Sequence, residues 1–244
     1  MNVTFGTLVA AILLAAVYLT GPRLLPRERQ GSRRWLSLAA GVSMTYVFLD
    51  VLPELGARHG AFLEKVGEVS FSEHRVYALA LVGFVVLYAL DEMVISARGE
   101  AEGDGARPET RSPIFTIHIA GFSLYGWVIG DALVRHADNG ILNLSLYTAA
   151  MVFHLLVVAS SLAREHGGLY HRQGRWVLAA SVGAGWGVAA FAPLPEIAMT
   201  RLFALVAGGV LMTSANEELP REKGGRFGWF VGGAAAYGTL LLLI

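Results

Sequence analysis

Eight long apolar segments follow one another along this 244-residue chain, separated by short stretches rich in charge, glycine or proline. Each has about 20 residues, the length that a helix needs to cross a hydrocarbon core of roughly 30 Å. A bilayer offers no water to unpaired backbone groups, so each segment is expected to be a transmembrane α-helix. The segments are 3–21, 35–55, 76–97, 114–134, 145–163, 176–194, 202–219 and 227–244.

The basic residues agree on one orientation of these segments. With the N-terminus outside, 14 of the 19 Lys and Arg residues fall on the inner side. Positively charged loops stay on the cytoplasmic side of a membrane. The sequence therefore predicts an all-α membrane protein with eight transmembrane helices and both termini outside. The basic cluster follows the first segment instead of preceding it, which indicates a retained helix and not a secretory signal.

Composition narrows the class of protein. With 55% hydrophobic residues, the chain has no room for a soluble domain, so residues 1–244 are expected to form one transmembrane domain in the cell membrane, in contact with the lipid bilayer. The absence of cysteine excludes disulfides and thiolate metal ligands. No basic face interleaved with aromatic residues is present, which argues against nucleic-acid binding. The charged, Gly-rich and Pro-containing segment 98–113 is expected to be a disordered cytoplasmic loop.

A faint internal repeat relates the second and seventh segments. At a constant offset of 167 residues, Gly41, Asp50 and Pro53 correspond to Gly208, Glu217 and Pro220. This predicts an inverted repeat of helices 1–3 and 6–8 around helices 4–5, a plan common in secondary transporters. Asp50 would then lie near the outer face and Glu217 near the inner face.

Ionisable side chains inside a membrane are costly and usually face a bundle interior or a wet path. His154 lies near the midplane, either as a hydrogen-bonding residue between helices or as a metal or proton ligand. Asp50 and Glu217 either line a cation path or bond the backbone freed by the following proline. The remaining candidates are His118 as a ligand, and Tyr125, Asn216 and Glu218 along the path.

The chain resembles the ZIP (Zrt/Irt-like) metal transporters. Phe48-Leu-Asp-Val-Leu-Pro-Glu-Leu55 is similar to the family's helix 2 ending F-L-H-L-L-P-E-A, with Asp50 where a His is common. The segment from Ala207 to Pro220 is similar to the helix 7 pattern that ends in E-x-L-P-E, with Glu217 on its first acid. The resemblance implies a permease for a divalent cation of the zinc, iron or manganese class, with zinc as the leading substrate and no resident cofactor.

The metal motifs of helices 4 and 5 depart from the family pattern. Helix 4 has Tyr125 in the His position of H-N-x-x-[DE]-G, and another register places His118 there. Helix 5 keeps only the His of H-E-x-P-x-E, as His154. The resemblance thus implies at most one sparse site, built from His154 with Asp50, Glu217 or His118. The alternative is a ZIP-fold protein that has lost metal transport and carries another substrate or serves as a sensor or scaffold.

An enzyme is not expected, because the chain has neither an H-E-x-x-H zinc motif nor a G-x-S-x-G nucleophile elbow. Gly228 and Gly232 have the small-xxx-small spacing of packed transmembrane helices. This spacing in the last segment permits a homodimer.

Overall fold

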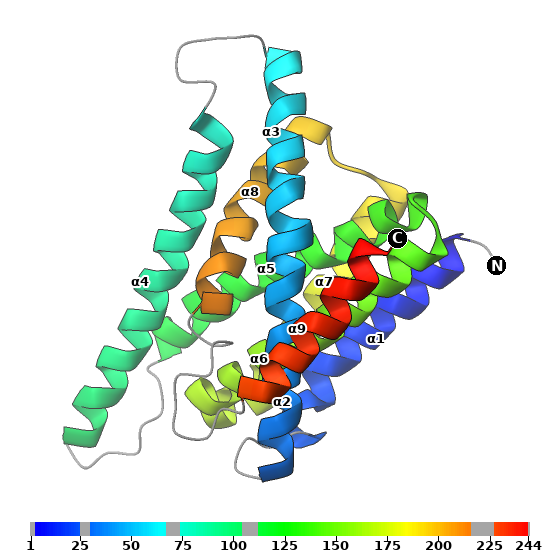
Figure 1. Cartoon of the computed structure of the whole chain (residues 1–244). Coiled ribbons are helices and arrows are strands. Elements are labelled where there is room, and N and C mark those ends of the chain that lie inside the picture. The colour runs from blue at the N-terminus through cyan, green and yellow to red at the C-terminus, as the bar shows by residue number, and fades with distance from the viewer. Residues whose placement is uncertain (1–2, 25–29, 67–73, 104–111, 216–226, 244) are drawn as a thin grey trace.

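The computed structural model describes residues 3–24, 30–66, 74–103, 112–215 and 227–243, and this part of the chain is helical almost throughout. Figure 1 shows the helices as one bundle. The elements are α1 (Val3–Leu24), α2 (Gln30–Tyr46), the π-helical η1 (Val47–Val51), α3 (Leu52–Val66), α4 (Arg75–Gly103), α5 (Ser112–Asp138), α6 (Ile141–Leu169), the π-helical η3 (Tyr170–Gly174), α7 (Arg175–Phe191), α8 (Glu196–Thr213) and α9 (Phe227–Leu242).

Six stretches of helix in the described ranges are long and apolar enough to cross a membrane, and α9 is a shorter apolar helix. The share of the apolar window buried inside the protein is 56% for α5 but only 22% for α4. The rest of α4 therefore offers apolar surface to lipid at the edge of the bundle. The expectation of an all-α, multi-pass membrane protein is confirmed.

The eight predicted apolar segments each overlap a helix over most of their length, but several boundaries differ, and α6 continues to Leu169 where the fifth segment was predicted to end at residue 163. The segment 98–113 was expected to be irregular, but α4 continues to Gly103 and α5 begins at Ser112, and residues 104–111 lie outside the described part. The second segment extends without interruption from α2 through η1 into α3. The π turn lies just before Pro53, whose ring would clash with the carbonyl four residues earlier in a regular α-helix.

Among the described helices, three pairs cross at glycines, and each of these glycines lies against the backbone of the partner helix. The pairs are α4–α8, α2–α9 and α5–α7, and a Cβ at any of these glycines would overlap partner backbone atoms. Small residues allow helices in a membrane to approach this closely. The crossings use Gly83 and Gly208, Gly41 and Gly233, and Gly130 and Gly185.

In the last segment, the glycine that packs against another helix is not one of the two that the spacing predicted. A Cβ at Gly228 or Gly232 would meet nothing within 4 Å, whereas Gly233 packs against the backbone of α2. The face of α9 that carries Gly228 and Gly232 is therefore open to lipid or to another chain. The small-residue spacing alone could not show which of three neighbouring glycines forms the contact.

These crossings predict a difference between two glycines of α7. Gly185→Ala is expected to lower the free energy of unfolding by about 1–3 kcal/mol, because its Cβ would overlap the carbonyl of Trp127. Gly183→Ala has open space around it and is the matched control, expected to be neutral or slightly stabilising. Thermal unfolding of both variants in detergent measures the difference. Equal melting temperatures would contradict the close α5–α7 crossing.

The chain reverses direction between α6 and α7. α5 and α6 are antiparallel. His166, near the end of α6, lies beside His118, near the start of α5, and Tyr147 of α6 donates a hydrogen bond to the carbonyl of Ile129 on α5 (3.0 Å). The reversal begins at Gly167, whose φ of +49° and ψ of −118° are readily available only to glycine. His166 consequently lies in the last turn of α6, against the first turns of α5.

The bundle has a loosely attached part. The α4–α8 pair is closely packed within itself but meets the other helices more sparsely, mainly through α3 and α5. In Figure 1, α4 lies at one edge of the molecule with α8 between it and α3. The largest fully buried side chains include Leu14, Leu133, Leu155 and Leu178, which belong to α1, α5, α6 and α7. The molecule therefore has a tightly packed body and a helix pair beside it.

Candidate functional site

Two cavities lie where the α4–α8 pair meets the tightly packed body. The larger, of about 110 Å³, is bounded by α8 on one side and by η1, α3, α5 and α6 on the other. The smaller, of about 20 Å³, is bounded by α4 and α8 on one side and by α5 and α6 on the other. Since α5 and α6 contribute opposite portions of their length to the two cavities, these lie toward opposite ends of the bundle. We call them the large and the small cavity.

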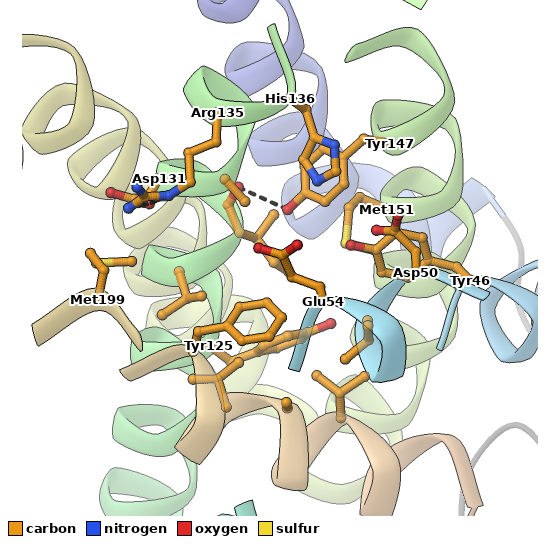
Figure 2. A pocket seen from close by; sticks show the side chains of 18 of the residues that line it. Tyr46, Asp50, Glu54, Tyr125, Asp131, Arg135, His136, Tyr147, Met151 and Met199 are labelled. Atoms are coloured by element: carbon orange, nitrogen blue, oxygen red, sulfur yellow. Dashed lines mark hydrogen bonds and ion pairs between the residues drawn. The ribbon is translucent and has the colours of Figure 1, made fainter. Parts of the chain in front are cut away.

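Three carboxylates line the large cavity, and arginines pair with two of them. Glu54 accepts a hydrogen bond from Nε of Arg58 (2.7 Å), and Asp131 pairs with Arg135 at an Nε–Oδ2 distance of 2.8 Å. Asp50, on the π turn η1, accepts a hydrogen bond from Tyr46 instead. Figure 2 shows Asp50 beside Tyr46 and Asp131 on another wall, with the Glu54 carboxylate between them.

Aromatic rings form much of the remaining wall of the large cavity. The rings of Tyr46 and Tyr147 meet edge to face, and His136 stacks on Tyr147 with centroids 4.1 Å apart. Arg58 lies over the ring of Phe203 at 4.6 Å and so connects α3 with α8. The cavity thus combines fixed carboxylates with aromatic faces, which attract cations.

His154 lies on α6 between Met151, which lines the large cavity, and Val158, which lines the small one. It is buried, with 1% of its surface exposed, and its Nδ1 is 2.6 Å from the hydroxyl oxygen of Ser43 on α2. The rings of Tyr125 and His154 meet edge to face at a centroid distance of 5.4 Å. The structure therefore connects His154 to α2 and α5 at the level between the cavities.

A group of three buried ligand-type side chains lies beside the small cavity. Nδ1 of His118 is 2.9 Å from Nε2 of His166 and 3.8 Å from Oε2 of Glu165. The exposed fractions are 4% for His118, 8% for Glu165 and 1% for His166. Among the described residues this is the one group of three or more His, Asp or Glu side chains that are close enough to share a metal ion.

Neighbouring side chains fix the orientation of this group. Ser161 donates a hydrogen bond to Oε1 of Glu165 (2.9 Å), and Arg164 donates one to the Ser161 hydroxyl (2.9 Å). Phe115 packs with its ring edge-to-face against His166. A carboxylate held through one oxygen presents the other oxygen in a defined direction, as is usual for metal ligands.

No protein-family model matches this chain, and no curated protein is significantly similar to it.

The sequence candidates fall into three sets. Asp50 and Tyr125 line the large cavity, and His118 lines the small one. His154 lies between the cavities and contacts Ser43. The last three candidates lie outside the described residues, namely Asn216, Glu217 and Glu218.

The sequence interpretation missed two members of the buried group, Glu165 and His166. The apolar fifth segment was expected to end at residue 163, which placed His166 in a loop. The signal that could have included them is the Gly167-Gly168 pair, because glycine commonly marks the position just after the end of a helix. Such a reading extends the helix to His166.

Proposed function

We propose that this protein is a transporter for a divalent metal cation of the zinc class, with the ZIP-like plan of eight crossings, both termini outside the cell membrane and an inverted repeat. The observation that carries the proposal is the pair of cavities at opposite ends of one interface. Carboxylates line the large cavity, and His118, Glu165 and Asp91 line the small one. A loosely attached helix pair that moves against the packed body would open each cavity in turn.

Two pairs of positions that are 167 residues apart have matching local structure, which supports the inverted repeat. Gly41 and Gly208 each form the close crossing of their own helix pair. A π turn begins at Val47 and another at Ser214, each six residues before a proline. The pairs α2–α9 and α4–α8 would exchange under such a repeat, which accounts for their similar crossings.

The positions of the arginines support one orientation of the bundle across the membrane. Arg164 of α6, Arg172 of η3 and Arg175 of α7 lie at the small-cavity end of the bundle. With these arginines on the cytoplasmic side, the large cavity faces outward and the small cavity inward. A cation would then enter at the large cavity and leave past His118 and Glu165.

A second candidate is transport of a small zwitterionic solute, which corresponds to a ZIP-like fold without metal transport. It is favoured by the Glu54–Arg58 and Asp131–Arg135 pairs, which place both signs of charge on the wall of the large cavity. A solute with one positive and one negative group would replace both pairings. The large cavity, at about 110 Å³, has space for several non-hydrogen atoms of such a solute.

Uptake into liposomes tests the proposal. Purified protein reconstituted in liposomes is expected to admit Zn²⁺ or Mn²⁺ well above the rate of protein-free liposomes, as followed by an internal metal-sensitive dye. Protein unfolded by heat before reconstitution is the control. Absence of uptake of both ions by folded protein would overturn the metal proposal and favour the second candidate, to be followed with radiolabelled amino acids.

A further inference from the structure

We infer that His118, Glu165 and His166 form a binding site for a single zinc-class ion, at the end of the small cavity and apart from His154. The inference deepens the proposed function and rests on it for the role of the ion as cargo. Binding itself is a separate property, because the three ligands are already assembled in the folded protein.

The distances fit a tetrahedral ion after a small adjustment. Zinc–nitrogen bonds of about 2.0–2.1 Å imply that two nitrogen ligands of one tetrahedral ion are roughly 3.3 Å apart. Nδ1 of His118 and Nε2 of His166 are now 2.9 Å apart, joined by a hydrogen bond that an ion would replace. Oε2 of Glu165 is 3.8 Å from the same Nδ1. All three ligand atoms lie within 4.8 Å of one another, and the two distances to Nδ1 of His118 would each change by about half an ångström around one ion.

The chemistry of the ligands selects the ion. Two imidazoles and one carboxylate suit Zn²⁺ and its neighbours Co²⁺ and Ni²⁺, whereas Mg²⁺ and Ca²⁺ prefer oxygen ligands only. Burial of all three side chains strengthens this preference, because water does not compete with the ion for their donor atoms. The site is therefore expected to discriminate against Mg²⁺ and Ca²⁺.

The small cavity provides the fourth position. At about 20 Å³ it has room for one water-sized group, and Asp91 of α4 lines it together with His118 and Glu165. A site with three protein ligands and one exchangeable position can take up and release its ion, in contrast to a closed four-ligand structural site. Asp91 belongs to the loosely attached helix pair, so movement of that pair changes what faces the open position.

Arg164 modulates the site from outside. Its guanidinium is 3.9 Å from Oε1 of Glu165 and donates to Ser161. A positive charge at this distance opposes a divalent ion on the same carboxylate. Arg164→Gln is therefore expected to tighten zinc binding severalfold.

Cobalt titration of the purified protein, without a polyhistidine tag, tests the site. Wild type is expected to show the intense visible absorption of tetrahedral Co²⁺ with one equivalent bound, displaced by Zn²⁺ and not by Mg²⁺. Loss of a group that only orients a ligand costs about 10–100-fold in metal affinity, so His118→Ala and His166→Ala should each weaken binding by about 100-fold or more. Glu165→Gln keeps the size of the side chain and should also weaken cobalt binding. It tests the site even if a histidine variant fails to fold.

His171→Ala is the matched control, because His171 lies one turn beyond the reversal and is only partly buried. It should leave the cobalt spectrum unchanged. A spectrum that survives Glu165→Gln and His166→Ala in folded protein, or the absence of any tetrahedral spectrum in wild type, would overturn the site. Binding without uptake into liposomes would retain the site and remove the transport proposal. Uptake by a variant unable to bind would retain transport and exclude this site from the path of the ion.

Discussion

Joining α4 to α5 by a short thiol bridge is expected to stop metal uptake completely. The chain has no cysteine, so two introduced cysteines are the only thiols present. A Cβ at Gly121 of α5 would lie 3.4 Å from the side chain of Leu87 on α4. Dibromobimane treatment of Leu87→Cys/Gly121→Cys would thus tie the loosely attached pair to the packed body at the edge of the small cavity.

The chain offers a control that shares one of these cysteines. A Cβ at Gly209 of α8 would also lie close to Leu87, so Leu87→Cys/Gly209→Cys places the same bridge within the α4–α8 pair. If the pair moves as a unit, this bridge should leave uptake close to that of the untreated variant. Equal inhibition by both bridges, or by neither, would contradict relative motion of the pair as the basis of transport.

Replacing Asp50 by Asn is expected to reduce metal uptake by about tenfold or more, the change that follows from a loss of only about 1.4 kcal/mol. Asparagine has nearly the same size and retains an acceptor for the Tyr46 hydroxyl. The variant therefore removes a negative charge from the large cavity with little change in packing. Asp50 is the informative carboxylate because the structure pairs Glu54 and Asp131 with arginines.

Asp138→Asn is the matched control for this change. Asp138 is exposed near the end of α5, at the large-cavity end of the bundle. Its replacement by Asn removes the same charge, but outside the cavity. Initial rates of zinc uptake are measured at several zinc concentrations, and only Asp50→Asn is expected to lower them. Equal rates for wild type and Asp50→Asn would exclude Asp50 from the cation path.

The sequence predicted the helices well for a physical reason. An apolar stretch that crosses a bilayer must satisfy its backbone internally, so length and apolar content suffice to predict helix. The same reasoning places His118 and Asp50 inside the bundle. It cannot say which faces meet, and for that reason Gly228 and Gly232 were assigned a packing role that Gly233 has in the structure.

The buried group was predicted only in part because it depends on a backbone reversal. His118 was a candidate from its position in an apolar segment, but its partners come from α6, beyond the expected end of that segment. Gly167 allows the helix to continue to His166 and then turn sharply. His154 was predicted either to form a hydrogen bond between helices or to be a metal or proton ligand, and its contact with Ser43 of α2 corresponds to the first alternative.

The glycine crossings also bear on the order in which the protein is made. In α2–α9 and α4–α8 the two partners are far apart in the chain, so each earlier helix enters the membrane well before its partner has been synthesised. Until then, the groove at Gly41 or Gly83 lacks the helix that packs there in the folded protein. Each pair therefore assembles late in biogenesis, only after its second helix, α8 or α9, has left the ribosome.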